Sequence, residues 1–170
     1  VRLKWRAQMV RHLFHLLPEN SLLDLGSGSC QWTREISAAN GNRNPICAAI
    51  FNKEMYEGNQ HGSFPENIER IHLDNFSEKL SERRFDFIVG YQLLTDENAG
   101  MLFSELKGLL KPGGQILLFD PNPWNPYQKV KRLFSKLFFF FKQAKKNQYF
   151  NRFDLSSLLS EIGYIKIKIL

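Results

Sequence analysis

Apolar residues along this chain occur in two patterns, short continuous runs and longer stretches in which they recur every three or four positions. The runs predict buried strands at residues 21–25, 46–51, 68–73, 85–91 and 115–120. The stretches with helical spacing predict helices at residues 3–17, 33–39, 55–60, 99–110 and 152–163. Residues 164–170 alternate isoleucine with lysine, a pattern typical of an edge strand. Strands and helices therefore alternate along most of the chain.

This alternation predicts an α/β fold. Strands that are separated by helices pair in parallel through right-handed crossovers, which places helices on both faces of the sheet. We therefore expect a Rossmann-like, doubly wound and mostly parallel sheet. Ligands of such sheets bind at the carboxyl ends of the strands, so polar residues at those ends are the first candidates for a site.

The end of the first predicted strand carries the most informative segment, SLLDLGSGSC at residues 21–30. Gly26 and Gly28 allow a tight turn, and the following helix brings backbone N–H groups toward a ligand. Gln31 stands where a dinucleotide-binding loop has its third glycine, and no phosphate-binding Gly-Lys-Ser/Thr follows. What remains is a D-x-G-x-G pattern that begins at Asp24, with an ordinary strand-to-helix turn as the alternative interpretation.

Three further segments follow this loop in a characteristic order. They are LDNF at 73–76, FDFIV at 85–89 and LKPGGQILLFDPN at 110–122, where a Lys-Pro-Gly-Gly turn separates a helix from an apolar strand. Together with the glycine loop they resemble the motifs of the class I S-adenosylmethionine-dependent methyltransferases, in the type 11-like group. The resemblance covers about residues 20–165. It implies S-adenosyl-L-methionine as the cofactor and methyl transfer as the activity.

The resemblance also implies a role for each matching residue. Asp24 would hold the methionine ammonium, directly or through its loop. The backbone at Gly26, Ser27 and Gly28 would approach the methionine and the ribose. The adenine would lie against Asp74, Asn75 and Phe76, and the methionine and sulfonium side against Tyr91 and Gln92.

The chain departs from the family pattern at the ribose. Ile50 stands where the family has an acidic residue that binds both ribose hydroxyls, and Asn52 is the nearest polar side chain, which we expect to replace it. Cys30 stands where the family has a third glycine, and the family's last antiparallel strand has no counterpart here. These departures motivate an alternative function, a non-catalytic methyltransferase-like module that binds a protein partner or a membrane surface.

Catalysis of methyl transfer rests chiefly on positioning, because a sulfonium methyl is already activated. Asp120 and Tyr91 are the candidates for a base toward a hydroxyl acceptor, although Asp120 also fits a turn cap before Pro121. The loop that follows would form the substrate wall through Asn122, Trp124 and Asn125. Trp32 is expected to pack on the sheet. The expected acceptor is a small molecule or a lipid-like molecule.

Most of the net charge of +6 comes from one segment. Residues 128–150 hold seven lysines or arginines, six phenylalanines and no acidic residue, so the rest of the chain is close to neutral. This predicts an amphipathic helix on an anionic membrane surface or a lid over a hydrophobic substrate. A core-packing helix with a solvated lysine face is the alternative, and nucleic-acid binding is not expected.

Composition limits the remaining possibilities. A chain of 170 residues with 43% hydrophobic content is expected to form a single domain over residues 1–170, with a helix at 1–19, a cofactor-binding core at 20–127 and a final helix and strand at 151–170. Cys30 and Cys47 lie in or beside predicted strands, which favours free thiols and a cytoplasmic protein. His12 and His15 share a helix face without a third ligand, so no metal site is predicted.

Overall fold

The computed structural model describes residues 2–26, 28–58, 63–73, 80–91, 93, 99–119 and 152–164. The chain divides into two compact units, Val1–Leu93 with Glu105–Phe119 and Leu94–Ser104 with Asp120–Leu170. The predicted helix at 128–150 and most of the strand at 164–170 lie outside the described residues.

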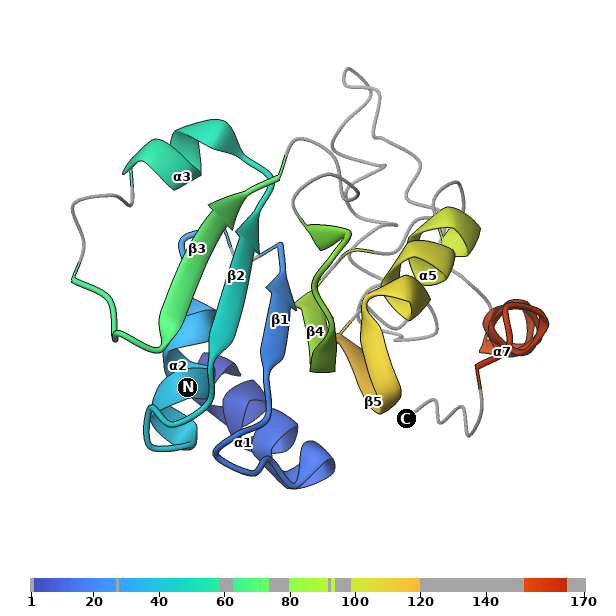
Figure 1. Ribbon diagram of the computed structural model, residues 1–170, viewed down its shortest axis with the longest axis horizontal. Helices are drawn as coiled ribbons and strands as arrows, with labels where there is room; N and C mark the ends of the chain where they lie inside the picture. Colours follow the sequence, from blue (N-terminus) through green and yellow to red (C-terminus); the bar gives the residue numbers. More distant parts are fainter. Residues whose placement is uncertain are drawn as a thin grey trace, which may run out of the picture. The chain divides into compact units, whose positions relative to one another are not determined.

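The first unit contains a sheet of five parallel strands in the order β3-β2-β1-β4-β5 (Figure 1). The strands are β1 (Leu22–Leu25), β2 (Ile46–Ile50), β3 (Ile68–His72), β4 (Phe85–Tyr91) and β5 (Leu110–Phe119). Since β2 and β3 lie on one side of β1 and β4 on the other, the strand order reverses at β1. This confirms the predicted Rossmann-like, doubly wound sheet.

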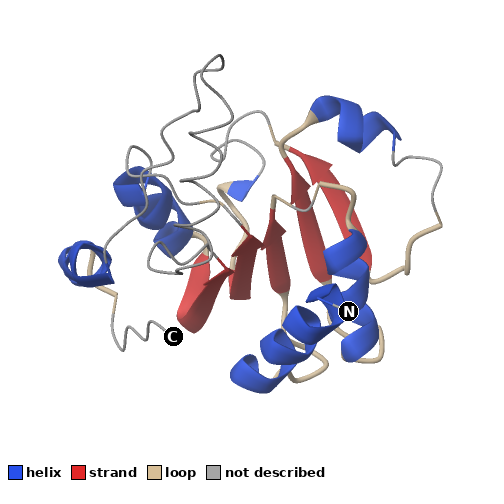
Figure 2. Cartoon of the chain, turned by 180° about the vertical axis from the view of Figure 1, so that it is seen from behind, coloured by secondary structure: helices blue, strands red, loops and turns tan. Residues whose placement is uncertain are grey.

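The central strands are buried on both faces, which explains their continuous apolar runs. Every residue of β1 and β2 is buried. On one face lie α1 (Arg2–Phe14) and α2 (Gln31–Ala39), side by side (Figures 1 and 2). Apolar side chains of these helices and of the sheet form one core cluster, in which Phe14 stacks on Phe87 with ring centroids 4.3 Å apart.

The boundaries of α1 and α2 follow from backbone geometry. The predicted helix at 3–17 ends earlier, at Phe14, because His15 adopts a left-handed conformation with φ of 49°. The predicted helix at 33–39 begins earlier, at Gln31, directly after Cys30, whose φ is 56°. Both residues occupy a region of φ that only glycine visits without strain, so each marks a sharp change of chain direction.

The predicted turn at residues 111–114 is wrong as a boundary, because β5 begins before it, at Leu110. Leu110 pairs with Phe85 and Gln115 pairs with Phe87, so residues 111–114 bulge from the strand opposite Asp86. Gly113, with φ of 79°, permits this bulge. The Lys-Pro-Gly-Gly segment therefore interrupts the pairing within β5 and does not precede the strand.

A polar network ties together the amino ends of the strands. Oδ2 of Asp86 accepts hydrogen bonds from the Ser21 backbone N–H at 2.7 Å, the Ser21 hydroxyl at 2.8 Å and Lys111 Nζ at 2.7 Å. Desolvation acts to raise the pKa of Asp86, but the hydrogen bonds from Lys111 and Ser21 outweigh it and lower the pKa. Asp86 thus joins the starts of β1, β4 and β5.

The second unit contains α7 (Arg152–Glu161) and the first turns of α5 (Ala99–Gly108). The Tyr164 hydroxyl donates a 2.8 Å hydrogen bond to the Phe103 carbonyl, and the two rings meet edge to face. Burial raises the pKa of Tyr164. None of the helices in the described ranges carries an apolar stretch long enough to cross a membrane. The element α3 (Lys53–Gly58) follows β2 in the first unit.

Candidate functional site

The chain leaves β1 through a loop in which three residues adopt left-handed conformations. Gly26 has φ of 73°, Gly28 of 50° and Cys30 of 56°. The Gly26 N–H donates to the Ala49 carbonyl at 3.1 Å, so the start of the loop stays anchored to β2. The loop lies at the carboxyl end of the sheet, beside the strand where the order reverses, which is the usual ligand position in such folds.

Side chains of neighbouring segments closely approach the two glycines of this loop. A Cβ on Gly26 would lie 3.0 Å from Leu93 Cδ2, and a Cβ on Gly28 would lie 3.5 Å from Met55 Sδ. At Gly26 the Leu93 side chain would have to move to admit a Cβ, so both the positive φ and the close packing favour glycine there.

Asp24, one residue before the end of β1, is completely buried. Its Oδ2 accepts a 2.6 Å hydrogen bond from the hydroxyl of Thr33, in the first turn of α2. The carboxylate thus links the two elements that flank the glycine loop.

Cys30, the residue before α2, is buried and provides no side-chain cap for the helix. Burial and then the charge of Asp24 raise the pKa of its thiol. Because no side chain caps α2, its N-terminus presents the N–H groups of Gln31, Trp32 and Thr33. The helix dipole favours an anion at this end.

The end of β2 differs from the family pattern, as the sequence indicates. Ile50 is completely buried in the apolar core and pairs with His72. Beyond it, Oδ1 of Asn52 accepts a 2.9 Å hydrogen bond from the Met55 N–H and caps α3. None of the described residues accepts a hydrogen bond from the Asn52 side chain, so its Nδ2 group is available to a ligand.

An aromatic cluster of Trp32, Tyr91 and Phe119 lies at the ends of β4 and β5. Tyr91 and Phe119 are paired across the two strands. The Trp32 ring meets both edge-on, with centroids 6.5 Å from Tyr91 and 5.6 Å from Phe119. From α1, the Arg6 guanidinium lies over the Tyr91 ring, 4.2 Å from its centroid.

Two donors at this cluster have no hydrogen-bond acceptor among the described residues. The indole Nε1 of Trp32 is buried without a partner. Arg6 is half-buried, and among the described residues its guanidinium contacts the Tyr91 ring. Trp32 packs on the sheet as expected, but neither its N–H group nor Arg6 was recognised from the sequence. The available signal was the position of Arg6 beside the apolar stripe of Leu3, Ala7 and Val10 on α1.

Part of the predicted site lies outside the described residues and stays a prediction. This part comprises Ser27, Asp74, Asn75, Phe76, Gln92, Asp120, Asn122, Trp124 and Asn125. The structure does bring together Asp24, Gly26, Gly28 and Tyr91, because β1 and β4 are adjacent and Leu25 pairs with Gly90.

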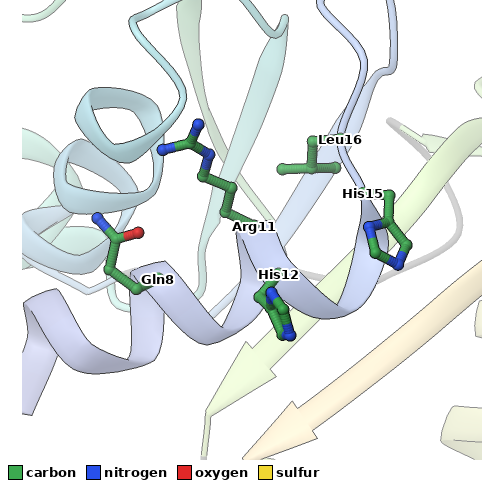
Figure 3. A pocket seen from close by; sticks show the side chains of 5 residues that line it. All are labelled: Gln8, Arg11, His12, His15 and Leu16. Atoms are coloured by element: carbon green, nitrogen blue, oxygen red, sulfur yellow. The ribbon is translucent and has the colours of Figure 1, made fainter.

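A surface pocket of about 380 Å³ is lined by residues of α1 and of the segment that follows it (Figure 3). The His12 and His15 rings at this pocket are 6.1 Å apart. In the part of the chain that the structure describes, no three histidine, cysteine or acidic side chains gather where they could hold a metal ion. The residues that line the pocket are Gln8, Arg11, His12, His15 and Leu16.

Comparison with known proteins gives one family and several relatives. A family model described as a methyltransferase domain matches residues 2–168. The demethylmenaquinone methyltransferase of Staphylococcus haemolyticus (strain JCSC1435) is 26% identical over 97% of this chain and 76% of the relative. The enzyme of the same name from Staphylococcus saprophyticus is 26% identical over 81% of this chain and 58% of the relative.

Solved structures share the fold. Human N-acetylserotonin methyltransferase in complex with SAM superposes with a TM-score of 0.69 at 18% identity, over 97% of this chain and 47% of that one. A SAM-dependent methyltransferase from Aquifex aeolicus gives 0.63 at 18% identity, over 92% and 78%. The chain thus spans about half of the human protein's length and about three quarters of the bacterial one's.

Proposed function

We propose that this chain, which belongs to the family of S-adenosylmethionine-dependent methyltransferase domains, methylates a small-molecule acceptor with a quinone-like ring. The cofactor of the family is S-adenosylmethionine. The observation that supports the proposal most strongly is the glycine loop at the carboxyl end of the sheet, where Gly26 and Gly28 adopt left-handed conformations directly after β1. The names of the curated relatives support a quinone-like acceptor.

The residues of the glycine loop fit this cofactor. S-adenosylmethionine supplies a methyl group that its sulfonium already activates. Gly26 and Gly28 would let the backbone approach its methionine and ribose, and the bond between Thr33 and Asp24 would hold the loop in place. The buried N–H of Trp32, which has no acceptor among the described residues, is a second feature that a polar ligand would account for.

At the ribose we propose that Asn52 replaces the missing acid. Its side-chain oxygen caps α3, which fixes the rotamer and leaves the amide Nδ2 for a ribose hydroxyl. One neutral hydrogen bond is weaker than two to a carboxylate. We therefore expect the ribose end of the site to contribute less affinity than it does in the family pattern.

The acceptor is proposed to lie beside Tyr91. This side chain ends β4, next to the start of the glycine loop, and the aromatic cluster gives that region an apolar wall. A flat ring packs well against such a wall. The apolar side chains would also exclude water from the site of methyl transfer. Asn122, Trp124 and Asn125 would complete the wall, with Asp120 or Tyr91 as the base for a hydroxyl acceptor.

The comparisons offer no support for the alternative of a non-catalytic module. Contact of residues 128–150 with a membrane surface stays a prediction. Such contact would suit a lipid-like acceptor.

Two measurements test the proposal. Calorimetric titration with S-adenosylmethionine should give a saturable signal, and a methyl-labelled cofactor should transfer its label to a short-chain demethylmenaquinone in its reduced form. Gly28→Val, which places a branched side chain at a positive φ in the loop, should abolish both signals. Absence of binding and of thermal stabilisation at millimolar cofactor would contradict the proposed function.

A further inference from the structure

The half-buried guanidinium of Arg6 is held by an aromatic ring. Its Cζ lies 4.2 Å from the centroid of Tyr91, a cation–π contact that uses the flat face of the group. No described carboxylate pairs with it, and the first turn of α1 contains no acidic residue. Because stacking leaves the N–H groups at the rim of a guanidinium free, Arg6 is oriented to donate to a further group.

The indole N–H of Trp32 is the second donor at this place. It is buried and, within the described ranges, has no acceptor. Buried donors without acceptors are rare, because they lose hydration and gain nothing in return. A ligand that accepts a hydrogen bond here would remove this cost.

Arg6 and Trp32 both neighbour Tyr91, which lies level with the start of the glycine loop. Leu25 of β1 pairs with Gly90 of β4, so the next residues, Gly26 and Tyr91, lie side by side at the carboxyl ends of these adjacent strands. Trp32 also lies in the first turn of α2, whose N-terminus has no side-chain cap. A guanidinium, a free N–H and a helix N-terminus all favour an anion at this position.

We propose that Arg6 and the Trp32 N–H bind the carboxylate of the cofactor's methionine moiety. The inference rests on the proposed function, since it takes S-adenosylmethionine as the ligand of the glycine loop. The cofactor carries one carboxylate, at the end of the molecule away from the adenosine. Asp24 makes the environment of the loop negative on its β1 side, which suits the ammonium and directs the carboxylate toward Arg6.

This assignment also accounts for the apolar end of β2. With Ile50 in place of an acid, the ribose end of the site holds no charged contact from that position. A charge-assisted pair at the methionine end would then supply the main polar anchor. Binding by this chain should accordingly depend on the amino-acid part of the cofactor more than on the ribose.

The experiment compares two ligands by calorimetry. S-adenosylhomocysteine carries the carboxylate, and 5′-deoxy-5′-methylthioadenosine keeps the adenosine and the thioether but lacks the amino-acid part. Arg6→Gln should weaken binding of the first about tenfold and change binding of the second less than about twofold, as expected for loss of one charge-assisted hydrogen bond. Trp32→Phe keeps the ring without the N–H and should weaken the first ligand by about threefold or more.

Arg11→Gln is the matched control, because Arg11 lies on the same helix, is exposed and lines the pocket away from the site. It should leave both affinities unchanged, and thermal melts should show that each variant is folded. If the wild-type chain binds neither ligand, the proposed function fails. If it binds both and Arg6→Gln weakens them equally or not at all, the function stands and the carboxylate assignment fails. An Arg6→Gln variant that keeps its cofactor affinity but shows a raised KM for the acceptor would likewise overturn it.

Discussion

The Thr33 hydroxyl donates a 2.6 Å hydrogen bond to Oδ2 of Asp24, and both side chains are completely buried. Asp24 belongs to β1 and Thr33 to α2, so this bond fixes the two ends of the glycine loop against each other. The shape of the loop therefore depends on a contact within the protein, between β1 and α2.

Thr33→Val should remove this bond while keeping the shape of the side chain. Loss of a donor to a buried carboxylate is expected to lower the free energy of unfolding by about 1.5–3 kcal/mol. Thr33→Ser, which keeps the hydroxyl, should lose about 1 kcal/mol or less. Urea unfolding followed by circular dichroism measures both, and equal stability of the valine variant and the wild type would refute the role given to this pair.

Gly26→Ala should destabilise the chain more than Gly113→Ala. Both positions have positive φ, which costs an alanine about 1–2 kcal/mol. A Cβ at Gly26 would also lie 3.0 Å from Leu93, whereas no atom of the described residues lies within 4 Å of one at Gly113. Chemical denaturation should therefore give Gly26→Ala a lower free energy of unfolding than Gly113→Ala. Calorimetry should show weaker S-adenosylhomocysteine binding for Gly26→Ala alone. Equal effects on binding would argue against the loop as the cofactor site.

The two buried thiols should be inert in the folded protein. Burial raises the pKa of Cys47 to about 12 and also raises that of Cys30. Neither should react with iodoacetamide near neutral pH, and both should react once urea unfolds the chain. Rapid alkylation of the native protein would show that the core opens.

The raised pKa of Cys47 also gives stability a dependence on alkaline pH. The unfolded thiol ionises near its ordinary value of 9.0, while the folded thiol resists ionisation up to about 12. The stabilising contribution is therefore complete below pH 9 and is lost as the pH rises through this window. Cys47→Ala should flatten the alkaline limb of the stability profile, and an unchanged limb would count against this cause.

Asp86 should produce an opposite dependence in acid. Its pKa is lowered in the folded state, so its contribution is present above the ordinary value of 3.8 and is lost as the pH falls through the folded value. Asp86→Asn should reduce the acid sensitivity of unfolding. Because the pair with Lys111 is partly exposed, Lys111→Met should cost only about 1 kcal/mol at neutral pH. Guanidinium unfolding at several pH values tests both.

Asn52→Asp should strengthen cofactor binding by about tenfold, because a carboxylate accepts from ribose hydroxyls more strongly than an amide donates to them. Aspartate caps helices as well as asparagine does, so α3 should remain intact. Asn52→Ala, which removes both the cap and the polar group, should weaken binding. If calorimetry with S-adenosylhomocysteine finds the three proteins alike, Asn52 does not face the ribose.

The positions of the strands along the chain could be predicted because buried parallel strands consist of uninterrupted apolar residues. β1, β2 and β3 each lie within one or two residues of the predicted ends, and β4 coincides with them. β5 begins earlier than the sequence predicts, at Leu110, because proline and two glycines usually end an element. Here they form a bulge between Leu110 and Gln115 that the neighbouring strand tolerates.

The site could be predicted only where its residues are close in sequence. Asp24, Gly26 and Gly28 form one local pattern with a known geometry. Arg6, Trp32 and Tyr91 come from three different elements, and none of them is unusual in its own segment. Their relation arises when α1 and α2 pack on the same face of the sheet, which no periodicity in the sequence specifies.

The polar network of Asp86 and the ring of Tyr91 occupy opposite ends of β4, five positions apart, or about 16 Å along the strand. Substitutions at such a separation usually act additively. The Ser21–Asp86–Lys111 network could therefore be stabilised first by substitution. Destabilising variants of the glycine loop could then be studied in the stabilised protein. In such a background, loss of ligand affinity could be separated from loss of folding.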